Sequence, residues 1–288
     1  MVQTKQLKQT DVQGQLDSAA QRLRQALPSL GQVGQKLSGL AALLAGAGLL
    51  LAVWQIVSLF STDLPGPALV LPTLWELISN PFYDNGPNDK GIGIQVWYSL
   101  GRVFSGWGIG SLIAIPIGVL MGTSQRVMRV LNPVVQVLRP VSPLAWYPIG
   151  LAAYKSTGDA VIFALVITSL WPTLINTMFG VASLPKDYRN VARVFQFSPW
   201  KYVFKVVLPY SLPHILTGLR LSMGIAWMVI VAAEMLAGGT GIGFFVWDSW
   251  NALSLPRVMS AILIIGVVGL LLDRLMEYLI RRVSYDNK

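Results

Sequence analysis

Cysteine is absent from this 288-residue sequence, and histidine occurs once, at His214. The first absence excludes disulfides, thiolate metal sites and a cysteine nucleophile. A single histidine argues against histidine-pair zinc sites and Ser-His-Asp triads. Charge is scarce too, since charged residues make up 12% of the chain, against about 25% in soluble domains. With 53% hydrophobic residues and a mean hydropathy of +0.57, we expect an integral membrane protein.

Nucleotide-binding motifs are also missing. The sequence has no G-x-x-x-x-G-K-[ST] motif, and the glycines from Gly238 to Gly243 lack the spacing and the strand-turn-helix setting of a dinucleotide site. These glycines instead predict a tight hairpin on the outer side of the membrane. The chain is therefore predicted not to be an enzyme, and any ATP chemistry must belong to another chain.

Long apolar runs dominate the rest of the sequence. A helix needs roughly 20 apolar residues to cross a hydrocarbon layer of about 30 Å. By this criterion the chain is an all-α membrane protein with six transmembrane helices, over 38–60, 103–121, 130–153, 160–182, 215–237 and 258–272 with a mixed extension. The predicted organisation is a tail over 1–37 with an amphipathic helix, the first helix over 38–60, an outer loop over 61–98, a five-helix core over 99–282 with a cytoplasmic segment over 183–213, and a tail over 283–288.

Basic residues are distributed unevenly between these spans. The loops on one side hold three, at Lys90, Lys155 and Arg257, together with six acidic residues. Because positively charged loops stay in the cytoplasm, both termini are predicted to be cytoplasmic, in an inner (plasma) membrane. The net charge of +9 follows from this asymmetry and needs no nucleic-acid partner. The opposite side holds sixteen basic residues: Lys5, Lys8, Arg22, Arg24, Lys36, Arg126, Arg129, Lys186, Arg189, Arg193, Lys201, Lys205, Arg274, Arg281, Arg282 and Lys288.

Three charged residues stand out inside the predicted spans. Arg139 lies about 13 Å deep in a third span with four prolines, and an intramembrane arginine is a functional hypothesis by default. Its alternative is a structural pairing with a carbonyl group or another helix. Arg220 is close enough to a span end to reach the cytoplasmic surface, and Glu234 lies about 21 Å further along the same helix, too far to pair with it. Arg139 is predicted to line a translocation pathway, together with Trp146, Asn176, Thr177 and Glu234.

The cytoplasmic segment over 183–213 has two helical patterns, Tyr188–Phe195 and Trp200–Val207. Ser198-Pro199 separates them, and Leu208-Pro209 is predicted to end the second. Two ordered helices cost more conformational entropy than a plain connecting loop would. A partner-binding role is therefore favoured, with a structural elbow as the alternative.

The stretch from Asn190 to Pro209 resembles the cytoplasmic "EAA" loop of the permease subunits of bacterial ATP-binding-cassette (ABC) importers. That loop reads Glu-Ala-Ala, three residues, Gly, nine residues, Ile-x-Leu-Pro, and the spacing here matches without a gap. The departures are Asn190 for Glu, Val191 for the first Ala, Gln196 for Gly and Val206 for Ile, whereas Ala192 and the Leu-Pro end agree.

Three further stretches resemble the nitrate, bicarbonate, sulfonate and taurine branch of that family. They are Arg139-Pro…Pro-Leu-Ala-Trp-Tyr-Pro, Trp171-Pro-Thr-Leu-Ile-Asn-Thr, and the run from Leu212-Pro to Glu234-Met. Asn85-Gly-Pro-Asn-Asp-Lys-Gly and Gly243-Phe-Phe-Val-Trp-Asp are most similar to the nitrate and bicarbonate permeases of cyanobacteria.

The resemblance implies a type I importer with a MetI-like permease fold. It implies a second permease copy, two cytoplasmic ATPases that bind the ATP, a periplasmic or lipid-anchored binding protein, and no cofactor on this chain. The implied substrate is nitrate (or nitrite), with bicarbonate or else a sulfonate, taurine or cyanate as alternatives. The residues implied to couple to the ATPase are Asn190, Val191, Ala192, Phe195, Gln196, Leu208 and Pro209.

Two other classes compete with this prediction. A secondary anion transporter usually has paired intramembrane carboxylates for ion coupling, and Glu234 is the one acidic residue well inside the predicted spans. A membrane-embedded enzyme needs clustered His, Asp or Glu near the bilayer, which this sequence does not offer.

Overall fold

The computed structural model describes residues 41, 45–61, 63–86 and 89–283. The predicted tail helix over 1–37, the start of the first span and nearly all of the tail over 283–288 lie outside the described residues. The chain divides into two compact units, Met1–Pro67 and Ala68–Lys288, which are described separately.

In the first unit, the described part of the predicted first span is the helix Ala45–Phe60. Its apolar side chains are exposed along its length, Leu50 at 73% and Phe60 at 88%, as suits a helix in lipid. Trp54 Nε1 donates a hydrogen bond to the Pro65 carbonyl oxygen at 3.0 Å, which fixes the turn after the helix.

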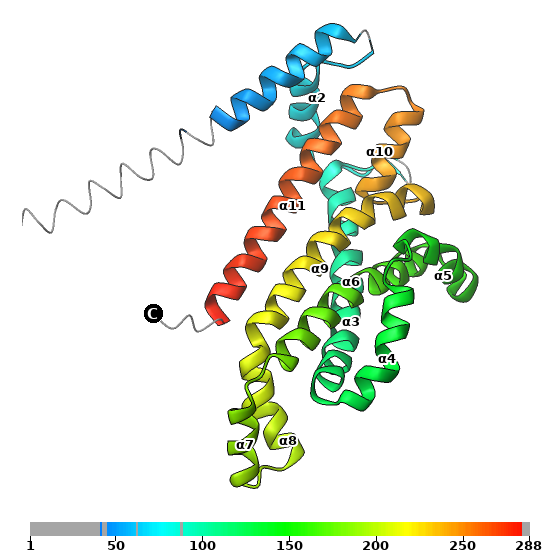
Figure 1. Cartoon of the computed structure of the whole chain (residues 1–288). Coiled ribbons are helices and arrows are strands. Elements are labelled where there is room, and N and C mark those ends of the chain that lie inside the picture. Colours follow the sequence, from blue (N-terminus) through cyan, green and yellow to red (C-terminus); the bar gives the residue numbers. More distant parts are fainter. Residues whose placement is uncertain (1–40, 42–44, 62, 87–88, 284–288) are drawn as a thin grey trace, which may run out of the picture. The chain divides into compact units, whose positions relative to one another are not determined.

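The named elements of the second unit are all helices, and within the described residues one isolated β-bridge joins Asp84 and Lys90 (Figure 1). Four of its helices are long and apolar enough to cross a membrane: α3, α6, the run Pro199–Ala237 and α11. Its elements are α2 (Pro67–Ser79), α3 (Ile92–Thr123), α4 (Gln125–Leu138), η1 (Pro143–Trp146), α5 (Tyr147–Tyr154), α6 (Thr157–Ala182), α7 (Lys186–Val194), α8 (Pro199–Tyr202), η2 (Val203–Val207), α9 (Leu208–Ala237), α10 (Ile242–Asn251) and α11 (Leu255–Val283).

Small residues bring α3 and α6 into close contact. Small residues recur at every fourth position on α3: Gly106, Gly110, Ala114, Gly118 and Gly122. The first four are buried, and Gly122 is partly buried. A Cβ added at Gly118 would lie 2.7 Å from Thr177 Cβ, and one at Gly122 would lie 2.6 Å from Val181 Cβ. Such stripes of small residues let the backbones of membrane helices approach closely. Close packing matters here because lipid provides no hydrophobic driving force for helix association.

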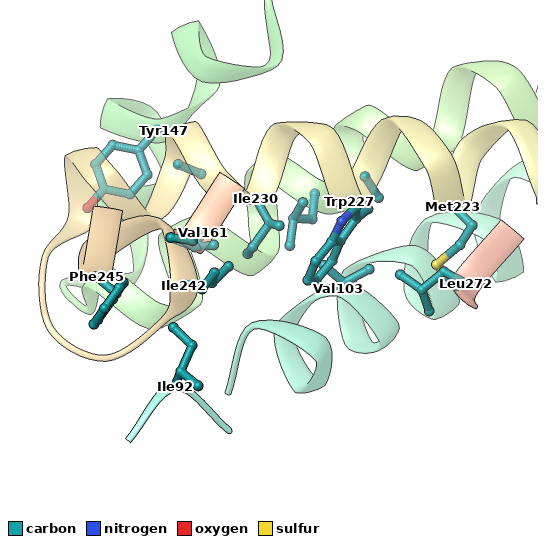
Figure 2. Close-up of a cluster of buried hydrophobic side chains, with 14 of the residues drawn as sticks. Ile92, Val103, Tyr147, Val161, Met223, Trp227, Ile230, Ile242, Phe245 and Leu272 are labelled. Carbon is teal, nitrogen blue, oxygen red and sulfur yellow. The ribbon is translucent and has the colours of Figure 1, made fainter. Parts of the chain in front are cut away.

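A large apolar cluster joins α3, α6, α9, α10 and α11 (Figure 2). Val103, Val161 and Ile230 are fully buried in it. Trp227 of α9 lies in the same cluster, and its Nε1 donates a hydrogen bond to the Ile265 carbonyl oxygen of α11 at 3.0 Å. This bond connects the packed centre of the unit to α11, whose apolar segment is mostly not buried.

The predicted third span over 130–153 is not one helix. Residues 125–154 form α4, the 3-10 turn η1 and α5 instead. Pro140 and Pro143 follow α4 directly, and each removes a backbone donor and sterically blocks a continuing helix. Pro133 lies inside α4, and Pro148 stands in the first turn of α5, where its missing N–H costs nothing.

The prediction that Leu208-Pro209 ends the second cytoplasmic helix is wrong. Pro199–Ala237 runs as one helical segment through Pro209. The π-helical turn η2 precedes the proline, and the Leu208 N–H donates to the Val203 carbonyl five residues back. This wider turn accommodates the proline ring, which would otherwise clash with the carbonyl four residues earlier.

The outer segment over 61–98 is more helical than predicted. The short helix expected at Leu74–Ile78 is the 13-residue α2, and α3 already begins at Ile92, eleven residues before the predicted span. Between them, Lys90 Nζ pairs with Asp84 at 2.5 Å, and this contact holds the pKa of Asp84 below its ordinary value.

Candidate functional site

Two cavities meet at Arg139. The first, of about 450 Å³, lies between α4 and α6 and is lined by Asn132, Val135, Gln136, Arg139, Pro140, Ile175, Met178 and Phe179. The second, of about 400 Å³, is lined by Arg139, Val141, Pro143, Thr168, Trp171, Pro172, Ile175, Asn176, Leu221 and Ile225. Arg139 and Ile175 are common to both, so this arginine stands at the junction of two hollows.

The break after α4 holds Arg139 in this position. Its backbone is helical at the C-cap of α4, where its N–H donates to the Val135 carbonyl oxygen at 2.9 Å. Within the described residues, the guanidinium makes no hydrogen bond or ion pair, whereas Arg102 of α3 and Arg220 of α9 are both paired with carboxylates. Arg139 is an exposed residue, and its guanidinium donors are not engaged by any described residue.

The other predicted pathway residues are placed differently. Asn176 lines the second cavity, and its Nδ2 donates to the Pro172 carbonyl oxygen at 2.8 Å, which leaves its second N–H and Oδ1 available. Thr177 is fully buried, donates to the Thr173 carbonyl at 2.7 Å and packs against Gly118, so it faces α3. Trp146 lies in η1, lines neither cavity, and has a buried Nε1 without a hydrogen-bond partner among the described residues.

Glu234 lies near the C-terminal end of α9, in a polar cluster that is closed to solvent. Its side chain is fully buried, and its Oε1 pairs with Arg102 Nη1 at 2.6 Å. Ser99 Oγ donates to Oε2 at 2.7 Å, and the Gly243 N–H donates to the same oxygen at 3.1 Å. These contacts tie α9, α3 and α10 together, and the carboxylate lines neither cavity.

Glycine backbone geometry makes this tie possible. Gly238, Gly239 and Gly241 have φ values of 71°, 89° and 152°, which side chains rarely adopt. The turn they form brings the Gly241 N–H to Gln95 Oε1 at 2.6 Å and the Ile242 N–H to Ser99 Oγ at 2.8 Å. The predicted glycine turn is present, and it serves to close the polar cluster.

Arg220 does not simply reach the surface, as the sequence suggested. Its Nε and Nη2 each donate to one carboxylate oxygen of Asp273 at 2.7 Å, a two-point contact between α9 and α11. Glu277 lies 3.7 Å from Nη2. The sequence placed both acidic residues in a mixed helix end, with no sign of which span they would face.

The α7–α8 elbow has a specific backbone turn. Gln196 has φ +49°, its N–H donates to the Arg193 carbonyl at 3.0 Å, and the Phe197 N–H donates to the Ala192 carbonyl at 2.9 Å. This is a Schellman motif, whose left-handed position usually carries glycine. The geometry explains why the EAA loop has Gly at the position that Gln196 occupies here.

The elbow exposes apolar side chains at its tip. Val194 is 79% exposed, Phe195 69% and Trp200 74%, whereas Ala192 is only 5% exposed. Ala192 instead lines a hollow of about 360 Å³ inside the elbow, so it does not share the exposed surface of Phe195, although the family resemblance implies that both residues couple to the ATPase. The hollow is lined by Thr123, Arg189, Ala192, Arg193, Phe197, Pro199 and Tyr202.

Comparisons with known proteins agree on one family. Residues 114–285 match "Binding-protein-dependent transport system inner membrane component". The chain is 47% identical over 231 residues to "Nitrate import permease protein NrtB" of Synechocystis sp., covering 80% of this chain and 84% of that protein. It is 45% identical over 251 residues to "Bicarbonate transport system permease protein CmpB" of Synechococcus elongatus, covering 86% and 90%. A structure of the MetNI methionine ABC transporter, inward-facing, gives a TM-score of 0.60 at 17% identity over 74% of this chain and 98% of that chain.

Proposed function

Since the chain belongs to the family of inner membrane components of binding-protein-dependent transport systems, we propose that it forms the membrane path of an ATP-driven importer for a small monovalent oxyanion, nitrate first. The chain is a non-catalytic permease of an ABC importer in the nitrate and bicarbonate branch, and it is a multi-pass inner-membrane protein. Such permeases carry no cofactor and work with ATPase subunits and a binding protein.

The observation that carries the anion proposal is the guanidinium of Arg139, which lies between two cavities and makes no ion pair with any residue in the described part of the chain. An anion that enters a low-dielectric region loses hydration worth of order 20 kcal/mol in an idealised medium, so its path needs compensating charge or donors. A guanidinium is always charged and offers a planar fork of donors that suits a planar oxyanion. Asn176 adds an amide on the wall of the second cavity.

Bicarbonate is the second candidate, because a bicarbonate permease is nearly as similar to this chain as a nitrate permease. Nitrate only accepts hydrogen bonds, whereas bicarbonate also donates one from its hydroxyl group. Asn176 Oδ1 is an acceptor on the cavity wall. An Asn176→Leu variant that loses bicarbonate uptake and keeps nitrate uptake would assign the acceptor to bicarbonate.

The assembly that we propose has two copies of this chain, two ATPases and a binding protein. The α7–α8 elbow faces the cytoplasm and meets the ATPase through Val194, Phe195 and Trp200, its exposed apolar tip. A Val194→Asp variant should insert normally and fail to retain the ATPase on purification. Leu253→Asp is the matched control, because Leu253 is 88% exposed near the opposite end of the unit and should leave the ATPase bound. Equal retention by both variants would refute the elbow contact.

The transport proposal is tested by nitrate uptake into vesicles with the complete importer. Arg139→Ala should abolish uptake while membrane insertion and ATPase binding stay normal, and Arg139→Lys should restore part of it. Arg274→Ala is the control, because Arg274 is 69% exposed and its ion pair with Glu277 lies away from both cavities. Wild-type uptake by Arg139→Ala would show that no anion depends on this residue.

A further inference from the structure

The polar residues of α4 form one stripe. Gln125, Arg129, Asn132, Gln136 and, at the C-cap, Arg139 are spaced by four, three, four and three residues. At about 100° per residue, these five positions fall within a sector about 80° wide, so they share one face of the helix. Arg126 is the one polar residue of α4 off this face, and α4 has no acidic residue.

The other faces of α4 are apolar, and their surroundings differ. Leu131 and Val135 pack against α3 and α6 in a buried cluster with Leu174 and Met178. Val130, Val134 and Val137 form a third face, 69%, 50% and 69% exposed. The polar stripe is therefore neither the packing face nor the apolar exposed face.

The C-terminal part of the stripe lines the cavity between α4 and α6, and Gln125 and Arg129 lie outside that lining. Asn132, Gln136 and Arg139 line the cavity from α4, and Ile175, Met178 and Phe179 line it from α6. No carboxylate lines this cavity. Within the described residues, no hydrogen bond or ion pair engages the side chains of the stripe, so their donors remain available to a ligand.

The spacing of the stripe suits stepwise transfer of a small ion. Arg129 and Arg139 are ten residues apart, about 15 Å along the axis, with two amide side chains between them. Each step is about 5 Å, so a small oxyanion can contact the next donor before it leaves the previous one. The start of α4 lies near the elbow, because Thr123, two residues before α4, shares a hollow with Arg189 and Arg193 of α7.

We infer that four residues of this stripe, Arg129, Asn132, Gln136 and Arg139, form the lane through which the anion leaves the cavity toward the cytoplasm. The inference rests on the proposed function and extends it from one arginine to a defined binding surface. Its ligand is a small monovalent anion that accepts hydrogen bonds. The second permease copy is the competing occupant of this face, and the experiment separates the two.

The test uses single cysteines and follows the labelling of this chain alone, which has no native thiols to remove. Gln136→Cys and Asn132→Cys are made in the complete importer, in inside-out vesicles. Their reaction rates with anionic sulfonatoethyl and cationic trimethylammonioethyl methanethiosulfonate are compared, each relative to a free thiol. Val137→Cys, on the apolar exposed face, is the positional control. Arg139→Gln combined with Arg129→Gln is the charge control.

If the stripe is an anion lane, the anionic reagent should be favoured by about tenfold or more at positions 136 and 132. The preference should fall in the Arg→Gln background, nitrate should slow the reaction, and Cys at Val137 should show no anion preference. Absence of reaction at position 136 from the cytoplasmic side would assign the face to the partner copy and overturn the inference. So would an equal preference at positions 136 and 137.

A second variant separates failure of the lane from failure of the proposed function. Asn132→Leu with Gln136→Leu should reduce nitrate uptake by about tenfold while Arg139 is intact, because two successive donors are lost. Val134→Leu with Val137→Leu is the matched control and should import normally. If Arg139→Ala stops uptake and the Asn132 and Gln136 double variant imports at the wild-type rate, the lane is wrong and the role of Arg139 stands. If Arg139→Ala itself imports normally, the proposed function fails.

Discussion

Two regions of this helical unit treat their charged residues differently: the polar cluster around Glu234 and the polar face of α4 that ends at Arg139. At the junction of α3, α9 and α10, Glu234 is fully buried and receives donors from Arg102, Ser99 and Gly243. Along α4, Arg139, Gln136 and Asn132 line a cavity and have no partner among the described residues. A charge in a membrane helix is thus either compensated within the protein, where it holds helices together, or left available, where it can serve a ligand.

The largest effect expected from this contrast is at the closed junction. Glu234→Ala should destabilise the permease by about 3–5 kcal/mol, because it leaves the partly buried guanidinium of Arg102 without its carboxylate. The measurement is the thermal unfolding midpoint of the purified importer. Arg102→Leu combined with Glu234→Leu should cost less than the sum of the single changes, since no charge remains unpaired. An unchanged midpoint for Glu234→Ala would remove the distinction between the two regions.

The next largest effect on stability is expected at the close contact between α3 and α6. Gly118→Ala should cost about 1–3 kcal/mol, because the added Cβ would lie 2.7 Å from Thr177 Cβ and α3 must shift away from α6. Gly108→Ala on the same helix is the matched control, because a Cβ there meets nothing within 4 Å. The control should be neutral or slightly stabilising, as alanine is the better helix former. If both variants unfold at the same temperature, the α3–α6 contact is not tight.

A smaller effect, of opposite sign, is expected at the elbow. Gln196→Gly should stabilise the importer by up to about 1 kcal/mol, because glycine adopts the left-handed conformation at φ +49° without a steric cost. Gln196→Ala keeps the Cβ and should leave stability unchanged. ATPase retention should persist in both, since neither alters the exposed tip. A loss of stability in Gln196→Gly would mean that the glutamine side chain makes a contact that outweighs its backbone strain.

The smallest effect on stability is expected at the open region. Arg139→Leu should change the unfolding free energy by no more than about 0.5 kcal/mol, because no partner of the guanidinium within the described residues loses a contact. Its uptake defect should nevertheless be complete. Unfolding of Arg139→Leu at a temperature as low as that of Glu234→Ala would show that Arg139 is also a structural residue.

Much of the fold is predictable because it depends on neighbours along the chain. Apolar runs indicated the spans that appear as α3, α6, α9 and α11, and the glycines from Gly238 indicated the turn before α10. The prolines of the third span signalled an irregularity, but the span was still predicted as one helix, and it is broken after Arg139. Pro209 was predicted to end a helix, but the helix continues through it, because a π-helical turn accommodates the proline ring.

The candidate site was predictable only in part. Arg139 was identifiable because an arginine in an apolar run is conspicuous wherever its partners lie. Asn132 and Gln136 were missed, although their spacing from Arg139 is visible in the sequence, because amides give a weak hydropathy signal. Arg102 was missed because the predicted span began one residue later, at Val103.

The sequence by itself determined that this is a membrane-embedded helical permease, because hydropathy, helix-breaking residues and the EAA-loop spacing are properties of short stretches. Only the tertiary structure decided which charges are compensated. Arg102 and Glu234 are 132 residues apart in the chain, and Arg220 and Asp273 are 53 apart. Whether such groups meet depends on how helices pack and turn about their axes. The same packing buries Thr177 and Ala192 and leaves Arg139 facing two cavities.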